Sequence, residues 1–262
     1  MSPLLITGLV GLTAMSALWL ASLALRDASI VDVWWGPGFG LLAVTAFVLA
    51  PQEPAPRAWL ALGLTGLWGL RLGGYLLWRN WGSAEDPRYT AMRRHFGPER
   101  FPWISLFTVF GLQGLLQWTV SLPVQVTLLR GGGGPGWNAL DALGVALFAV
   151  GLAFETVGDA QLARFRSDPT NRARVMDRGL WRYTRHPNYF GDFCVWWGLG
   201  ALALAGTGAV WTLIGPALMS FLLLRVSGVA LLERSIGRRR PAYADYADRT
   251  SAFFPRPPRR AS

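Results

Sequence analysis

Apolar segments of about 20 residues recur along this chain, and they constrain its fold more than any other feature. A helix needs roughly 20 apolar residues to cross the hydrocarbon core of a bilayer. Charged side chains are only 15% of the 262 residues, too few to cover a soluble domain of this length. We therefore predict an all-α integral membrane protein, a bundle of seven transmembrane helices at about 3–25, 29–50, 57–79, 103–129, 137–161, 188–206 and 208–233.

The segments are expected to form a single membrane domain over residues 1–262. Glycine-rich stretches at Gly131–Gly136 and Gly206–Gly208 predict tight turns between segments. The first apolar run, 3–25, is long enough to span a bilayer and lacks a basic leader. We therefore interpret it as a membrane helix and not as a cleaved signal.

Arginine positions predict the orientation of the bundle. All 25 basic residues are Arg, and 21 of them lie in the C-terminal tail or in the loops after the first, third and fifth segments. Short cytoplasmic loops carry such an excess of positive charge. We predict that the N-terminus is outside and the C-terminus cytoplasmic, with the net charge of +10 reflecting topology and not nucleic-acid binding.

Ionisable side chains also occur inside the predicted spans, where each costs about 2.5–3.5 kcal/mol on insertion scales. Several lie four residues from another polar group and so share a helix face with it, as do Glu155 and Asp159. Buried salt bridges that fix helix packing are one explanation, and the wall of a polar cavity on the cytoplasmic side is the one we favour. The ionisable side chains are Asp32, Arg71, Glu155, Asp159, Asp192, Arg225 and Glu233, and the amides at four-residue spacing are Gln113, Gln117 and Asn188.

The loop between the fifth and sixth segments carries seven arginines within 22 residues, interleaved with aromatic residues. Guanidinium groups bind phosphate in a bidentate fashion, and aromatic rings stack on heterocycles. A topogenic loop that contacts anionic lipid headgroups is the alternative. We favour a site for a phosphorylated, base-containing ligand, with candidate residues Arg164, Arg166, Asn171, Arg172, Arg174, Arg178, Arg182, Tyr183, Arg185 and His186.

Other site types have little support in the sequence. The chain has no GxGxxG following a strand and no phosphate-binding loop with Gly-Lys-Ser/Thr. The glycines at 36, 38, 69, 73 and 74 are better explained by close helix packing. Its two histidines, His95 and His186, and its single cysteine, Cys194, lack ligand spacing, so no metal site is expected.

The run GLWRYTRHPNYFGD at 179–192 resembles the steroid 5α-reductase C-terminal domain family, in particular its bacterial branch. Further similar stretches are FETVGDAQLARFR at 154–166, SIVDVWWG at 29–36, EDPRY at 85–89 and YADYADRTSAFFP at 243–255. Their order and spacing fit as well, and together they cover most of the chain from the second segment onward.

This resemblance implies a membrane reductase that binds NADPH from the cytoplasmic side, mostly through residues 155–262. Hydride would go to a carbon–carbon double bond conjugated to a ketone in a steroid-like or other lipid substrate. Carried over by position, the resemblance implies cofactor contacts at Asp159, Arg166, Asn188, Asp192 and Arg225. It implies weaker ones at Glu155, Arg164, Asn171, Tyr183, Arg185, His186, Glu233, Tyr243 and Tyr246.

One departure from the family concerns the group that assists the ketone. Steroid-reducing members use a Glu and a Tyr, but Trp35 falls at the Glu position and Trp68 near the Tyr position. Asp32, one helical turn before Trp35, is our first candidate for the catalytic acid, and Tyr89 is the second. A carboxyl group in a poorly solvated bundle can stay neutral and donate. We expect the substrate to contact Trp35, Trp68, Gln113 and Gln117.

Two other functions remain open from the sequence. Membrane methyltransferases of the isoprenylcysteine carboxyl methyltransferase type share the Arg-His-Pro-x-Tyr-x-Gly run at 185–191 and an acidic residue late in the chain, matched here by Glu233. They bind S-adenosylmethionine, which carries no phosphate for the arginine-rich loop to bind. A non-enzymatic lipid-binding protein is the second alternative. We expect contacts with membrane lipids, a bacterial inner membrane and a cytoplasmic active site, and the sequence indicates no oligomeric state.

Overall fold

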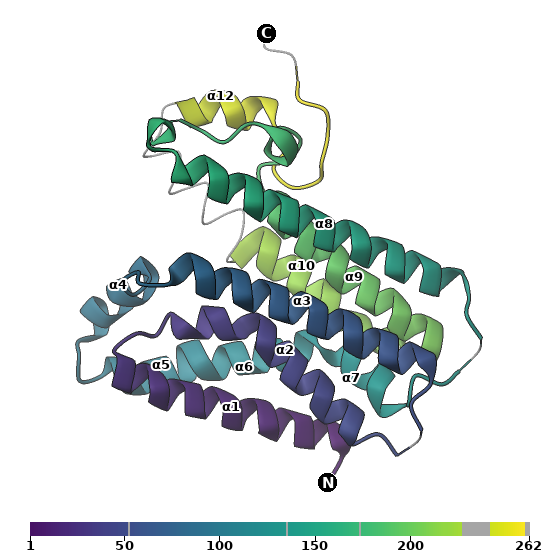
Figure 1. The fold of residues 1–262 in the computed structure, drawn as a ribbon. Helices are drawn as coiled ribbons and strands as arrows, with labels where there is room; N and C mark the ends of the chain where they lie inside the picture. The colour runs from purple at the N-terminus through teal and green to yellow at the C-terminus, as the bar shows by residue number, and fades with distance from the viewer. Residues whose placement is uncertain (52, 135, 173, 227–241, 260–262) are drawn as a thin grey trace. The chain divides into compact units, whose positions relative to one another are not determined.

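The computed structural model describes residues 1–259 except 52, 135, 173 and 227–241, and this described part contains helices and no strand. In chain order its α-helices are α1 Pro3–Leu25, α2 Ile30–Val48, α3 Pro56–Asn80, α4 Pro87–Phe96, α5 Phe101–Ser105, α6 Leu112–Val120, α7 Leu122–Leu129, α8 Ala139–Ser167, α9 Pro187–Thr207, α10 Ile214–Phe221 and α12 Ala242–Arg249 (Figure 1). Short 3₁₀ turns cover Pro169–Asn171, Gly179–Arg182 and Val210–Leu213, and π-helical turns cover Leu106–Gly111 and Leu222–Val226.

Five helical stretches within the described residues are long and apolar enough to cross a bilayer: α1, α2, α3, Phe101–Val120 and α8. The chain is thus a multi-pass membrane protein. The sixth predicted segment coincides with α9, while the seventh is described only as far as Val226, where its last turns are π-helical. Seven spans and the orientation of the termini stay predictions.

The predicted continuous helix at 103–129 was wrong. The structure divides it into α5, a π-helical turn, α6 and α7, with α6 ending at Val120 and α7 beginning at Leu122. Pro123 stands in the first turn of α7. Proline has no backbone N–H and its ring collides with the preceding turn, so an α-helix cannot continue through it unchanged.

Buried side chains take up the backbone groups at this break. The amide of Gln125 donates to the carbonyl of Trp118 at 2.9 Å and to the hydroxyl of Ser121 at 2.6 Å. Its side-chain oxygen accepts from Thr7 of α1 at 2.6 Å. Lipid offers no replacement hydrogen bonds, so a break inside a membrane needs such internal partners. We name Thr7, Trp118, Ser121 and Gln125 the elbow cluster.

Two compact units make up the chain: residues 1–136 with 202–214, and residues 137–201 with 215–262. In the first unit α2 lies between α1 and α3 (Figure 1). A Cβ built on Gly36 of α2 would lie 2.4 Å from the Gly69 carbonyl oxygen of α3, and one on Gly69 would lie 2.5 Å from that of Gly36. The two backbones touch, and only glycine fits at either position.

The same unit confirms most of the glycine-packing prediction. Gly73 packs against Pro37, and Gly38 packs against the side-chain amide of Gln117. Gly74 was wrongly included, because a Cβ at that position would meet nothing within 4 Å. The predicted turn at 131–136 is confirmed, with positive φ at Gly131, Gly132 and Gly134.

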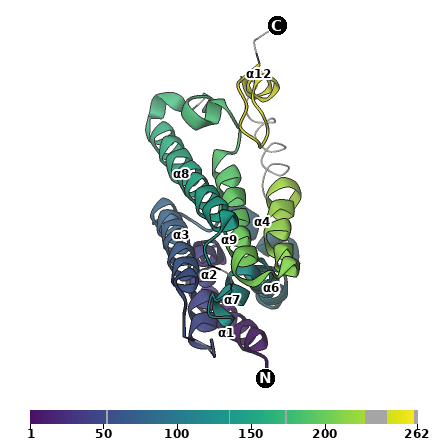
Figure 2. The same ribbon diagram turned by 90° about the vertical axis from the view of Figure 1, so that its right-hand side faces the viewer.

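In the second unit α8 and α9 run side by side (Figure 2). A Cβ on Gly151 of α8 would lie 2.5 Å from the Gly191 carbonyl oxygen of α9, and one on Gly191 would lie 2.5 Å from that of Gly151. One on Gly198 would likewise lie 2.6 Å from the Gly144 oxygen. These helices are therefore also in backbone contact.

The C-terminal tail is tied to the segment that precedes α9. The backbone N–H of Arg185 donates to Ser251 at 2.9 Å, and that of Arg256 donates to Tyr183 at 3.0 Å. Phe253 and Phe254 then pack edge-on against Phe190 and Phe193 of α9. The tail is thus part of the second unit and fixes the conformation of the residues just before α9.

Candidate functional site

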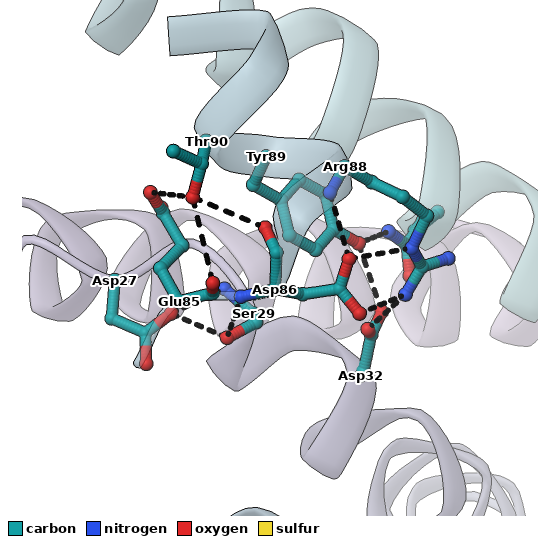
Figure 3. A network of polar contacts seen from close by, with 9 residues as sticks. Asp27, Ser29, Asp32, Glu85, Asp86, Arg88, Tyr89 and Thr90 are labelled. Carbon is teal, nitrogen blue, oxygen red and sulfur yellow. Dashed lines mark hydrogen bonds and ion pairs between the residues drawn. The ribbon is translucent and has the colours of Figure 1, made fainter. Parts of the chain in front are cut away.

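In the first unit, Asp32 lies at the start of α2 and has both carboxylate oxygens engaged (Figure 3). Tyr89 of α4 donates its hydroxyl to Oδ1 at 2.8 Å. The guanidinium of Arg88 donates to Oδ2 at 2.6 Å, in an ion pair. The structure therefore brings together both sequence candidates for the catalytic acid, with Asp32 as the acceptor and Tyr89 as the donor.

A second carboxylate holds Arg88 from the other side. Asp86 caps the N-terminus of α4 by accepting from the Arg88 backbone N–H, and it also accepts from the Arg88 Nε, both at 2.9 Å. The Arg88 guanidinium carbon lies 5.4 Å from the centre of the Tyr89 ring. Arg88 thus bridges two carboxylates and lies beside the buried phenol.

Glu85 anchors the same region to the connection between α1 and α2. It accepts from the Ala28 backbone N–H at 2.9 Å and from the Arg93 guanidinium at 2.7 Å. Ser29 donates its hydroxyl to Asp27, and its oxygen accepts from the Asp86 backbone N–H at 3.4 Å. These contacts fix α4 at the end of α2 where Asp32 lies (Figure 3).

Three titratable groups of this region outside the spans, Glu85, Asp86 and Tyr89, have shifted pKa values. Burial raises the pKa of Glu85 and of Asp86, but hydrogen bonds from Arg93 and Ala28 to the first and from Arg88 to the second outweigh it, so both lie below their ordinary values. Burial and the charge of Asp32 raise the pKa of Tyr89. At neutral pH Tyr89 therefore keeps its proton.

Two glutamines of α6 complete the cluster. Gln113 donates its amide to the Tyr89 hydroxyl at 3.3 Å, whereas Gln117, fully buried, donates to the backbone carbonyl of Trp35 at 2.7 Å. Trp68 is fully buried, with its ring against Phe39. Of the four predicted substrate-contacting residues, Gln113 is the one that touches the candidate acids; the contacts of all four with a substrate stay predictions.

In the second unit, Glu155 and Asp159 are both buried on α8, as their spacing predicted. Asn188 at the start of α9 donates its side-chain amide to Asp159 at 3.4 Å. The Glu155 side chain lies against Gly191, where a Cβ would come within 2.7 Å of its Cγ. Two carboxyl groups and an amide therefore meet where α8 and α9 are in backbone contact.

The arginine-rich segment begins on α8 itself. The predicted fifth helix ended at 161, but α8 continues to Ser167, so Arg164 and Arg166 occupy its last turns and not a loop. Cationic side chains are favourable there because they complement the negative end of the helix dipole. Six arginine side chains of this segment are exposed: Arg164, Arg166, Arg172, Arg174, Arg178 and Arg182.

Other predicted cofactor contacts have structural roles in this unit. Asn171 donates to the Phe165 carbonyl at 3.1 Å, and Arg185 donates its guanidinium to the Ala247 carbonyl at 2.7 Å. Tyr183 is 42% exposed, while the buried His186 ring stacks on Tyr189. Whether these residues also contact a cofactor stays a prediction.

The remaining predicted residues lie on α9, α12 and the last described turns. Asp192 is half-buried on α9, Arg225 lies in the π-helical turn Leu222–Val226, and Glu233 lies outside the described residues. Tyr243 and Tyr246 are buried on α12, and the Tyr246 hydroxyl donates to the carbonyl of Trp181.

Sequence reasoning missed the contacts of Arg88 and Trp181, although it noted Trp181 among the aromatic residues of the arginine-rich loop. Trp181 donates its indole N–H to the Gly158 carbonyl of α8 at 3.0 Å and so ties the arginine-rich segment to the helix that carries Asp159. Each missed residue stands in a stretch already noted for its family resemblance, EDPRY and GLWRYTRHPNYFGD. Position within those stretches was the available signal.

Comparison with known proteins gives a family model that matches most of the chain and a curated relative that matches part of it. A curated protein described as "Probable O-methyltransferase ustE" from Ustilaginoidea virens is 30% identical over 119 residues, which are 45% of this chain and 37% of that protein. The chain thus matches little more than a third of that relative's length. No solved structure matches. A family described as "Protein of unknown function (DUF1295)", related to steroid 5-alpha-reductase-like membrane proteins, matches residues 18–250. The chain therefore belongs to the DUF1295 family.

Proposed function

We propose that this protein is an NADPH-dependent membrane reductase that saturates the conjugated double bond of an enone in a steroid-like or other lipid. The observation that carries the proposal is the second unit's arginine-rich segment, which has six exposed arginine side chains and is hydrogen-bonded to α8 and to the C-terminal tail. Relatedness of the family to steroid 5-alpha-reductase-like proteins supports the same activity.

The chemistry of these side chains fits a dinucleotide phosphate. Exposed guanidinium groups pair with phosphate oxygens, and the aromatic residues of the same segment offer faces for a base. Asp159 and Asn188, held together by a hydrogen bond, provide an acceptor and a donor suited to ribose hydroxyls or a carboxamide. NADPH, when bound, supplies the hydride.

The contacts of Asp32 and Tyr89 bear on which group would assist the ketone. Hydride addition to the β-carbon moves the electron pair of the double bond toward the carbonyl oxygen, and a proton then joins the α-carbon. A hydrogen-bond donor at that oxygen stabilises the developing negative charge. Because both Asp32 oxygens accept hydrogen bonds while Tyr89 carries a proton, the contacts favour Tyr89 as this donor, with its hydroxyl hydrogen turning from Asp32 to the ketone.

A methyltransferase is the second candidate, and the matched relative named as a probable O-methyltransferase is the observation that favours it. Such an enzyme would bind S-adenosylmethionine, which has no phosphate for the exposed arginines to bind. The reductase accounts for those arginines and the methyltransferase does not.

Ligand binding by the full-length protein in detergent tests the proposal. Tryptophan fluorescence is titrated with NADPH, NADH and S-adenosylmethionine, and NADPH is expected to bind more tightly than NADH because its extra phosphate gains charged hydrogen bonds. Asp159→Asn is expected to weaken NADPH binding, while the control Asp177→Asn, an exposed acid of the same segment, leaves it unchanged. Binding of S-adenosylmethionine without NADPH binding would overturn the reductase assignment.

A further inference from the structure

The contacts that Arg88 makes in the first unit are not explained by the anchoring of α4 alone. A second arginine of the same helix, Arg93, already forms an ion pair with Glu85 at 2.7 Å. Arg88 instead reaches Asp32, the one carboxylate that accepts the Tyr89 hydroxyl. The Arg88 side chain is 52% exposed, but that of its partner Asp32 is only 22% exposed.

From this arrangement we infer that Arg88 is the positioning residue that keeps Asp32 ionised and so makes Tyr89 the hydrogen-bond donor to the substrate ketone. The role of Arg88 in turnover rests on the proposed reductase function. The statement that Arg88 keeps Asp32 ionised does not depend on that function.

The hydrogen bonds around Asp32 favour its ionised state. A neutral carboxyl group would place its proton on one oxygen, but Oδ1 accepts from Tyr89 and Oδ2 accepts from a guanidinium, which cannot accept a hydrogen bond in return. The charged groups that face this carboxylate are Arg88 and Asp86 of the α4 region, and α6 contributes the neutral amide of Gln113 beside Tyr89. Arg88 is therefore the cation that compensates Asp32.

That charge state determines which residue donates to the ketone. An ionised Asp32 has no proton to give, whereas the Tyr89 hydroxyl hydrogen can turn about its C–O bond toward a carbonyl while Gln113 still donates to the phenol oxygen. Negative charge that develops on the substrate oxygen would be repelled by a lone carboxylate nearby. Because Arg88 pairs with Asp32, the ketone oxygen would meet a salt-bridged carboxylate and not a lone one.

The first test reads the charge of Asp32 directly. Infrared difference spectra of the detergent-solubilised protein detect the C=O stretch of a protonated carboxyl group. A band that disappears in the Asp32→Asn variant belongs to Asp32. In the wild type at neutral pH no Asp32-dependent band is expected. In Arg88→Gln a band is expected to appear, and the double variant with Asp32→Asn is expected to lose it. An Asp32-dependent band in the wild type, or none in Arg88→Gln, would contradict the inference.

The second test compares the two arginines of α4. Arg88→Gln is expected to lower kcat about 100-fold, as does removal of one preorganised donor, with little change in the KM for the enone. Turnover of this variant gains a pH dependence from Asp32 protonation, and Arg88→Lys restores most of kcat. Arg93→Gln removes the equivalent anchor but touches neither Asp32 nor Tyr89, so it is expected to lower the melting temperature without changing the pH profile.

Equal effects of Arg88→Gln and Arg93→Gln on kcat and pH profile would make Arg88 an anchor only. If the wild type reduces no enone while the infrared band behaves as expected, the reductase proposal fails and the assignment of Arg88 to the charge of Asp32 stands.

Discussion

The helix pair α2–α3 in the first unit and the pair α8–α9 in the second have the same kind of glycine contact. They differ in the side chains that surround the acids near that contact. Each pair is in backbone contact through two glycines, Gly36 with Gly69 and Gly151 with Gly191. Each also has an acid one helical turn from its glycine, Asp32 before Gly36 and Glu155 after Gly151. Small residues allow helices to approach closely in a membrane, and the same closeness shields a nearby carboxyl group from lipid.

What surrounds each acid differs. Around Asp32 a short helix supplies one cation and one phenol, and both are in contact with it. Near Glu155 and Asp159 the chain supplies a long segment with six exposed arginine side chains. The first arrangement suits a chemical step with fixed geometry, and the second suits binding of a large anion. Under the proposed function, the same kind of helix contact would serve two different tasks.

Tyr89→Phe is the substitution with the largest expected effect, because it removes the donor and little else. We expect kcat to fall about 100- to 1,000-fold, with NADPH affinity retained because that site is assigned to the second unit. The matched change Tyr246→Phe removes the hydroxyl bonded to the Trp181 carbonyl and is expected to cost about 1 kcal/mol of stability. Steady-state kinetics and thermal unfolding check the pair, and undiminished turnover in Tyr89→Phe would exclude it as the donor.

Glycine substitutions test whether the two helix contacts are equivalent. Gly69→Ala and Gly191→Ala each place a Cβ within 2.5 Å of a backbone oxygen, and overpacking of this kind costs about 1–3 kcal/mol or more. Gly74→Ala, on the same helix as Gly69, meets nothing within 4 Å and is the control. Melting temperatures in detergent give the result. A tolerated Gly69→Ala or Gly191→Ala would show that the backbones are not in contact.

Removing two exposed arginines tests where the anion binds. Arg174→Gln with Arg178→Gln is expected to weaken NADPH binding about 10- to 100-fold, since each exposed charge pair is worth about 0.2–1 kcal/mol or somewhat more where it binds phosphate. Arg94→Gln with Arg100→Gln removes two exposed arginines of the first unit and is expected to leave affinity unchanged. A fluorescence titration at constant ionic strength compares the two doubles. Equal losses would assign the effect to overall charge.

The smallest expected effect is the pH dependence of α4 docking. The pKa of Glu85 in the folded chain lies below its ordinary value of 4.5, so its contribution to stability is complete above that value and is lost as the pH falls through the lowered pKa. Because the Arg93–Glu85 pair is partly exposed, we expect about 0.5 kcal/mol. Melting temperature measured against pH for the wild type and Glu85→Gln checks this, and parallel curves would contradict it.

The sequence predicted the long helices well because each is one apolar run of bilayer length. The bounds 3–25 are those of α1, and 57–79 differs from α3 by one residue at each end. The break at Ser121 escaped prediction because apolar residues continue on both sides of Pro123, so hydropathy does not change there. Satisfying that break depends on Thr7, which is distant in sequence.

The candidate site was predicted in part. The four-residue spacing of Glu155 and Asp159 placed them on one face, and both are buried. Arg88 was missed because the topology argument counts all loop arginines alike, and only the fold shows that this one meets Asp32 across 56 positions. Gly74 was wrongly grouped with Gly73 because adjacent positions on a helix point in different directions.

The elbow cluster has a consequence for how this sequence can diverge. Gln125 contacts Thr7, Ser121 and the Trp118 carbonyl at once, so its replacement alone leaves several polar groups without partners in a nonaqueous interior. Related chains that retain Pro123 should therefore inherit positions 7, 121 and 125 as a correlated set, and chains that lose the proline should be released from all three together.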